Sequence, residues 1–216
     1  NFDISSNVTA VVDVMNRNES SSNHTSTHLL HQALRDILGK HVEQKGSSVS
    51  SDGLRFDFSH FKKIDNDQLK EIENYVNNRI DDSIELEENN NENYNDAINK
   101  GAIGLFGEKY GNKVRTIKYG NSYELCGGTH VRNTVNIRNF LIVSESSIAS
   151  GIRRIEAISG KKSINYLSDR NNEINELKVI LSSNKGALDS VRNLKNENSE
   201  LSKTLKKSQK KLIQFY

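Results

Sequence analysis

The chain has 216 residues, with 30 lysine and arginine side chains against 28 aspartates and glutamates, and a mean hydropathy of −0.70. No apolar run approaches the roughly 20 residues that a membrane-spanning helix needs, which excludes a transmembrane protein and gives no reason to expect a membrane partner. The single cysteine, Cys126, cannot form an internal disulfide, and no signal-peptide pattern opens the chain. We therefore expect a cytoplasmic protein, although an organellar targeting segment on a longer precursor stays open.

Helical and strand-like patterns are mixed over the first 160 residues. A helix is predicted to begin at His24, with Asn23 as its cap, and to end at Gly39, because apolar side chains form a wide face between them. A second helix is predicted over 67–82, where apolar residues recur at spacings of three and four. Apolar alternation predicts strands over 54–58, 114–119, 135–144 and 151–158.

The stretch 87–95 is rich in asparagine and glutamate and is predicted to be a surface loop, because it offers almost nothing apolar to bury. Together these patterns predict an α+β fold for the first part of the chain.

The last part of the chain differs in charge and in period. Residues 1–160 carry 18 basic and 22 acidic groups, a net charge of −4, whereas residues 161–216 carry 12 basic and 6 acidic groups, a net charge of +6. Apolar residues recur at sevens, with Asn184 and Asn198 on the same stripe and Phe215 near its end. This pattern predicts a long helix with a coiled-coil-like seam, capable of self-association.

Two short motifs contain side chains that bind metals. His24 and His28 are four residues apart on the first predicted helix, which places both imidazoles on one face. Cys126 and His130 are also four apart, and the two glycines between them allow a tight turn. One sulfur and three nitrogens suit zinc in tetrahedral geometry, so the sequence predicts that these four residues form a zinc site.

The remaining histidines are less informative. His31 lies on the apolar side of the first helix, and we expect a packed core histidine rather than a fifth ligand. His60 alternates with two phenylalanines, and the pattern leaves open a surface residue at the end of a strand or a site residue. His41 follows Gly39 and is placed to complement the carboxyl end of the helix.

Six motifs in order resemble the editing domain of alanyl-tRNA synthetases, over about residues 20–160. They are His24-Thr-Ser-Thr-His-Leu-Leu-His31, Gln44-Lys-Gly-Ser47, Arg55-Phe-Asp-Phe-Ser-His60, Gly107-Glu-Lys-Tyr-Gly111, Glu124-Leu-Cys-Gly-Gly-Thr-His-Val131 and Gly151-Ile-Arg-Arg-Ile-Glu-Ala157. The related editing domain of threonyl-tRNA synthetases typically has Cys-Arg-Gly-Pro-His in the cysteine loop. The Cys-Gly-Gly-Thr-His of this chain therefore favours the alanyl branch.

The resemblance implies a zinc-containing editing fold that hydrolyses the ester of serine or glycine wrongly attached to alanine-specific tRNA. Such a second site is needed because a synthetic site cannot strongly reject a smaller or merely hydroxylated amino acid. It also implies that Thr27, Gln44 and Ser47 line the catalytic pocket. Gly127, Gly128 and one of the alternating pair Arg153 and Arg154 are the candidates for contact with substrate or the tRNA end.

The resemblance divides the chain into a remnant of a preceding β-barrel or linker (1–20, with a strand over 8–13), the zinc-dependent editing domain (21–160) and the start of a carboxyl-terminal coiled coil (161–216). The residues that an aminoacylation domain would supply are not in this sequence, so the ligase activity would belong to a longer parent. Two alternatives stay open: a free-standing deacylase of the alanyl type, and a non-catalytic coiled-coil module stabilised by zinc.

Overall fold

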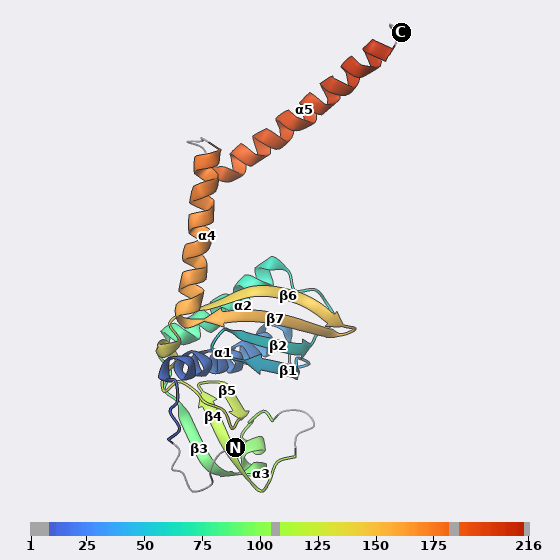
Figure 1. Cartoon of the computed structure of the whole chain (residues 1–216). Helices are drawn as coiled ribbons and strands as arrows, with labels where there is room; N and C mark the ends of the chain where they lie inside the picture. Colours follow the sequence, from blue (N-terminus) through green and yellow to red (C-terminus); the bar gives the residue numbers. More distant parts are fainter. Residues whose placement is uncertain (1–8, 105–108, 182–185, 214–216) are drawn as a thin grey trace, which may run out of the picture. The chain divides into compact units, whose positions relative to one another are not determined.

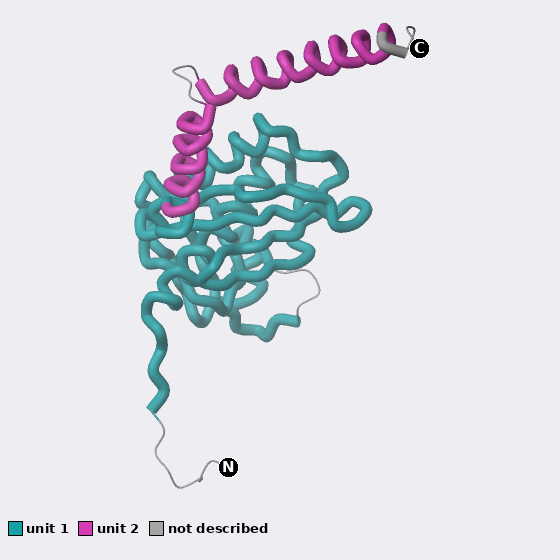
Figure 2. Tube along the Cα trace, turned by 45° about the horizontal axis from the view of Figure 1, so that its top comes forward, with its two compact units in different colours: residues 1–164 teal, residues 165–216 magenta. Residues whose placement is uncertain are grey.

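The computed structural model describes residues 9–104, 109–181 and 186–213. The chain divides into two compact units, residues 1–164 and 165–216 (Figure 2). The first unit combines helices with antiparallel sheets, which confirms the predicted α+β class.

Two antiparallel sheets make up most of the first unit, and helix α1 lies between them (Figure 1). The larger has the order β1-β2-β7-β6, with β1 at Gln44–Val49, β2 at Leu54–Ser59, β7 at Ile152–Ser159 and β6 at Phe140–Ala149. The smaller has the order β3-β4-β5, with β3 at Glu87–Asn93, β4 at Lys113–Tyr119 and β5 at Ser122–Leu125. The helices of this unit are α1 (Val14–Leu38), α2 (Asn66–Asp81), α3 (Tyr94–Asn99) and the short 3-10 helix η1 (Thr134–Ile137).

Helix α1 begins well before the predicted position. Asp13 is its cap, because the Asp13 carboxylate accepts the Asn16 N–H at 3.0 Å, so the prediction of Asn23 as the cap is wrong. Asn23 lies inside the helix and is buried; its amide donates to the Ser50 carbonyl at 2.8 Å and accepts the Ser159 N–H at 3.1 Å. It therefore ties α1 to the ends of β1 and β7.

The predicted end of this helix is confirmed, since Gly39 is its carboxyl cap at φ +119°. The strand predicted over 8–13 is absent from residues 9–13, and Val8 lies outside the described residues.

The main core forms where α1 and α2 pack against the larger sheet. Leucines of α1 meet the inward-facing phenylalanines of β2, and α2 adds a stripe at three- and four-residue spacing. Burial of each such side chain stabilises the fold by about 1.5–3 kcal/mol. The fully buried residues of these elements include Leu29, Leu30, Leu34, Phe56, Phe58, Ile72, Val76 and Ile80.

The strands predicted over 54–58, 114–119 and 151–158 and the helix predicted over 67–82 are confirmed. The strand predicted over 135–144 is wrong in its first part, because η1 occupies that part and β6 begins only at Phe140.

The loop predicted over 87–95 is also wrong. Residues 87–93 form β3, an outer strand of the smaller sheet paired with β4, and α3 begins at Tyr94. Outer strands tolerate such polar sequences because one edge and much of the surface face water.

The second unit is helical, as predicted, and the structure describes the predicted long helix as two helices. Helix α4 spans Gly160–Ile180, beginning within the first unit, and α5 spans Ala187–Ile213; Gly186 directly precedes α5. Asn184 and Phe215 of the predicted stripe, like Gly107 of the fourth motif, lie outside the described residues. Within the described ranges, no helix has both the length and the apolar character needed to cross a bilayer.

Candidate metal centre and adjoining pocket

The four predicted metal ligands come together in the structure. His24 and His28 lie one turn apart on α1, and Cys126 and His130 lie in the loop that follows β5. One candidate ligand atom from each residue lies within 4.8 Å of the others. The Cys126 Sγ is 3.5 Å from the His24 Nε2 and 3.3 Å from the His130 Nε2. The prediction that the two motifs converge is therefore confirmed.

This cluster fits a tetrahedral ion such as zinc. With metal bonds of about 2.0–2.3 Å, tetrahedral ligand atoms lie roughly 3.3–3.8 Å apart, and the two sulfur–nitrogen distances fall in that range. The Gly128 N–H donates to the Cys126 Sγ at 3.4 Å, a contact suited to a thiolate. The buried Nδ1 of His28 has no hydrogen-bond partner in the described part of the chain. The residues present therefore fit a bound metal.

The electrostatics of the cluster keep its imidazoles neutral, as a metal ligand must be. Burial, reinforced by the neighbouring His28, lowers the pKa of His24 to about 4. Burial also lowers the pKa of His28 and that of His130.

Position 128 requires glycine because the His24 ring lies close to its backbone, and not because the backbone is strained. A Cβ at this position would lie 2.1 Å from the His24 Cε1, so any larger residue would displace the His24 ring. A Cβ at Gly127 would meet nothing within 4 Å. The predicted contact of both glycines with substrate stays a prediction, and the structure adds a packing reason for Gly128 alone.

Arg115 holds the cysteine loop in place, and the sequence analysis missed it. From β4, its Nη1 donates to the Cys126 carbonyl at 2.9 Å and to the Gly128 carbonyl at 2.6 Å. Its Nε donates to the Glu88 carboxylate at 2.7 Å. A single arginine in an alternating strand gives no local signal of this role, because the contact depends on how β3, β4 and the loop are arranged.

Thr25 is a second residue that the sequence analysis missed. Its Oγ1 lies 3.1 Å from the His130 Nδ1 and accepts the Val131 N–H at 3.2 Å. A partner on Nδ1 fixes the orientation of the ring and leaves the other nitrogen to face the metal. The only available signal was its position between His24 and His28.

The predicted site residue Thr27 is buried, and its hydroxyl donates to the Asn23 carbonyl one turn earlier at 2.8 Å. Its role in a pocket stays a prediction.

A pocket of about 190 Å³ adjoins the metal cluster. Glu124 connects the two: one carboxylate oxygen lies 3.5 Å from the His28 Nε2, and the other lies 3.0 Å from the His31 Nδ1. The lining residues are His31, Arg35, Glu43, Gln44, Ile103, Gly104 and Glu124. Burial opposes ionisation of Glu124, but His28 and His31 outweigh it and lower the pKa of this carboxyl. The pocket therefore contains a negative charge.

His31 is buried beside Phe56 and lies outside the four-residue cluster, as expected of a packed histidine. It has a further role that was not predicted, because it anchors Glu124 and lines the pocket.

Gln44 lines the pocket from β1, and its amide donates to the hydroxyl of the exposed Ser47 at 3.0 Å.

The two arginines of β7 pair with different acidic residues. Arg153 forms an ion pair with Glu145, and Arg154 forms a bidentate pair with Asp57 at 2.7 and 2.8 Å. Neither belongs to the lining of the pocket. Contact of either with tRNA stays a prediction.

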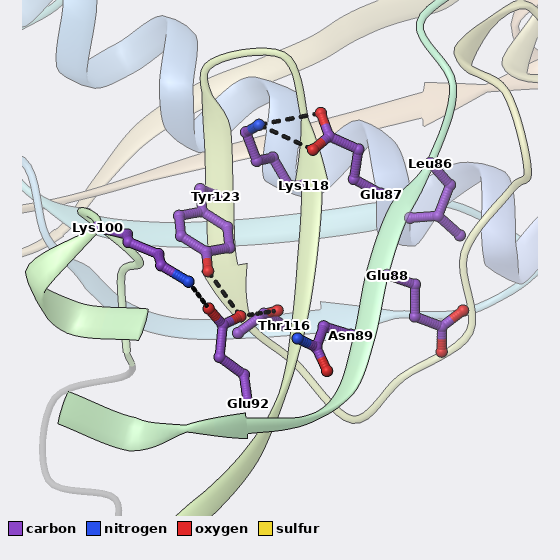
Figure 3. Close-up of a pocket in the computed structure, with 9 residues that line it drawn as sticks. All are labelled: Leu86, Glu87, Glu88, Asn89, Glu92, Lys100, Thr116, Lys118 and Tyr123. Atoms are coloured by element: carbon purple, nitrogen blue, oxygen red, sulfur yellow. Dashed lines mark hydrogen bonds and ion pairs between the residues drawn. The ribbon is translucent and has the colours of Figure 1, made fainter. Parts of the chain in front are cut away.

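A larger, open hollow of about 710 Å³ lies on the smaller sheet (Figure 3). There the buried Glu92 carboxylate accepts hydrogen bonds from Lys100, Thr116 and Tyr123, each at 2.8 Å. Lys118 pairs with Glu87 at 3.0 Å. Since these charges are paired within the protein, we interpret the hollow as a polar network that fastens β3 and the end of α3 to β4 and β5.

Substitution Glu92→Gln should lower the free energy of unfolding by about 1–3 kcal/mol at pH 7, because a buried charged acceptor of three hydrogen bonds is lost. The hydrogen bonds from Lys100, Thr116 and Tyr123 lower the pKa of Glu92 from 4.5 to about 2. The stabilisation by ionised Glu92 in the wild type is therefore complete above pH 4.5 and is lost as the pH falls toward 2. The difference in free energy of unfolding between wild type and variant should accordingly be smaller at pH 3 than at pH 7. Urea unfolding at pH 7 and pH 3 measures both effects. The exposed pair partner Glu87 provides the control Glu87→Gln, and equal effects of the two substitutions would contradict the network.

Comparison with known proteins agrees with this geometry. Residues 114–156, which include the cysteine loop, match the family described as the threonyl and alanyl tRNA synthetase second additional domain. The chain is 51% identical over 196 residues to the alanine–tRNA ligase of Christiangramia forsetii, which covers 91% of this chain and 22% of that protein. It is 47% identical over 205 residues to the ligase of Flavobacterium psychrophilum (95% and 23%) and 42% identical over 203 residues to that of Parabacteroides distasonis (94% and 23%).

The chain thus contains an additional domain of the type shared by threonyl- and alanyl-tRNA synthetases. Over 91–95% of its length the chain matches a segment of alanyl-tRNA synthetases. The chain spans about a fifth of the length of the curated relatives it matches.

Proposed function

We propose that this region hydrolyses the ester bond of serine or glycine wrongly attached to alanine-specific tRNA. The observation that carries the proposal is the junction of a four-ligand metal cluster and a small polar pocket through one carboxylate, Glu124. The family of the relatives supports tRNA as the partner, and their identity as ligases favours the editing part of a synthetase over a free-standing deacylase.

We further propose zinc as the metal, held by His24, His28, Cys126 and His130. When bound, zinc supplies a positive charge that can polarise an ester carbonyl or a water molecule. Four protein ligands fill a tetrahedral sphere, which favours an ion that positions the substrate over one that activates water in an open position.

The side chains of the pocket account for binding and selection. The ionised Glu124 is suited to receive the α-ammonium group of the aminoacyl ester, which is the only charge that serine and glycine carry in this linkage. The Gln44 amide is suited to orient a hydroxyl or the attacking water. This contact accounts for the choice of serine over alanine, because a site that hydrogen-bonds a hydroxyl discriminates strongly against the analogue that lacks it.

Deacylation of seryl- and alanyl-tRNA, measured side by side with and without a chelator, tests the proposal. We expect rapid release of serine, slow release of alanine and loss of the serine activity on removal of the metal. Equal release of both amino acids would contradict the assigned specificity, and absence of release in metal-loaded protein would contradict the function.

Exposed leucines on α5 favour a second role, self-association through the carboxyl-terminal helix. Leu188, Leu194, Leu201 and Leu205 are each more than half exposed, although such residues are usually covered. Sedimentation of the full chain should show a dimer or larger species, and Leu201→Glu should shift it toward the monomer. A monomeric wild type at high concentration would exclude this role.

A further inference from the structure

A pair of histidines lies next to the pocket but outside the machinery described above. His41 precedes β1 and His60 follows β2, and the His41 Nε2 lies 2.9 Å from the His60 Nδ1. The rings are stacked with centroids 5.2 Å apart, and the His41 ring lies against Gly39. The segment containing His41 also borders the pocket, because Arg35, a lining residue, donates to the Val42 carbonyl at 2.8 Å.

Phe61 continues this edge and is unusually exposed. Its side chain is 86% accessible, although a phenylalanine in a folded unit is normally covered. Its ring is nevertheless supported, because a Cβ at Gly151, in the turn between β6 and β7, would lie 2.9 Å from the Phe61 Cε1. The His60 N–H donates to the Gly151 carbonyl at 3.0 Å. The ring therefore contacts the hairpin at Gly151, while most of its surface is open to water.

The charges along this edge favour a polyanion. Lys40, Lys62 and Lys63 are exposed, and Lys62 is close enough to act electrostatically on His60. Two acidic groups beside this edge are already paired, Glu43 with Lys45 at 2.8 Å and Glu145 with Arg153. These three lysines form no ion pair within the part of the chain that the structure describes, so the edge combines positive charge with imidazoles and an open aromatic ring.

The spacing connects this edge to the pocket. Gln44, which lines the pocket, is paired with Phe58 in the sheet, so His60 and Phe61 follow two and three residues beyond that level. At roughly 3.3 Å per residue this is a reach of about 7–10 Å. Stacked bases rise by about 3.4 Å each, so the edge can accommodate the last two or three nucleotides of a strand whose end enters the pocket.

We propose that His41, His60 and Phe61 form a binding track for the single-stranded 3′ end of tRNA, an inference that rests on the proposed function of the pocket. One ring N–H is used in the hydrogen bond between the two histidines, and the N–H that remains on the pair donates to a phosphate oxygen. Phe61 stacks on a base near the aminoacylated end. The surrounding lysines add attraction that is independent of sequence.

The test combines RNA binding with hydrolysis, using the full chain loaded with zinc. Anisotropy of a short labelled RNA ending in CCA measures binding without chemistry, and steady-state deacylation of seryl-tRNA separates KM from kcat. Phe61→Ala should weaken RNA binding and raise KM by about 5- to 100-fold, the loss expected for one stacked base. The double substitution His41→Asn and His60→Asn should also raise KM. The conservative variant Phe61→Tyr keeps an aromatic face and should bind the RNA as the wild type does.

Val143→Ala is the matched control, because Val143 is an exposed apolar residue on β6, at the opposite edge of the larger sheet from β1. If wild type and Phe61→Ala bind the RNA equally and have the same KM, the proposed binding track is wrong. The exposed ring would then serve another contact, such as one with a protein. RNA binding that depends on Phe61 without any hydrolysis would support the track while contradicting the proposed function. Failure of the wild type to bind the RNA would overturn the track.

Discussion

Substitution Cys126→Ala should reduce zinc affinity by more than about 100-fold and abolish hydrolysis of seryl-tRNA. The reason is that Cys126 is the only sulfur in the cluster, and loss of even an outer partner of a metal ligand typically costs about 10- to 100-fold in affinity. Metal content after dialysis and competition with a chromophoric chelator measure the affinity, and release of labelled serine measures the activity.

The fold should largely survive this change, because most of the core comes from α1, α2 and the larger sheet, and Cys126 is only partly buried against it. Circular dichroism of the metal-free wild type and the variant should therefore agree. In the wild type zinc should raise the melting temperature, and in the variant it should not. Stoichiometric zinc and unchanged activity in Cys126→Ala would disprove the assignment of this ligand.

Substitution Arg115→Ala should have the second largest effect, a loss of about 10- to 100-fold in zinc affinity with little change in the fold. Without the guanidinium, the carbonyls of Cys126 and Gly128 lose the donor that holds them at 2.9 and 2.6 Å, and the loop that presents Cys126 and His130 loosens. Arg115→Lys should recover only part of the affinity, because an ammonium group cannot reproduce the planar fork that serves both carbonyls and Glu88.

Lys118→Ala is the control for this experiment, since Lys118 is on the same strand but pairs with Glu87. It should leave zinc affinity within about twofold of the wild type, as expected for an exposed ion pair. If Arg115→Ala binds zinc as tightly as Lys118→Ala does, Arg115 does not position the loop.

The four-residue cluster could be predicted because the two motifs that form it are local in the sequence. A spacing of four residues places His24 and His28 on one helix face, and two glycines make the turn between Cys126 and His130 feasible. The residues that contact this cluster from other segments could not be predicted in this way. Arg115 reaches the loop only through the pairing of strands, and Glu124 lies near His28 and His31 only because β5 packs against α1.

The errors in the fold have physical causes as well. The beginning of α1 was missed because residues 14–22 are mostly polar, while the first turn is set by Asp13. Strand β3 was missed because its inward-facing group is Glu92, whose burial is offset by three hydrogen-bond donors from other segments. In both cases the stabilising partners lie outside the local pattern of apolar residues.

The placement of α1 between the two sheets means that a metal bound at the cluster would have a mechanical effect. His24 and His28 belong to a helix fastened to the larger sheet through Asn23, whereas Cys126 and His130 follow a strand of the smaller one. An ion bound there joins residues 102 positions apart and acts as a reversible cross-link between the sheets. Closing so long a loop restricts the unfolded chain, by about 4–5 kcal/mol if it constrains the chain as a disulfide does. Amide exchange in β3, β4 and β5 should therefore quicken when the ion is withdrawn, and the smaller sheet should open before the larger.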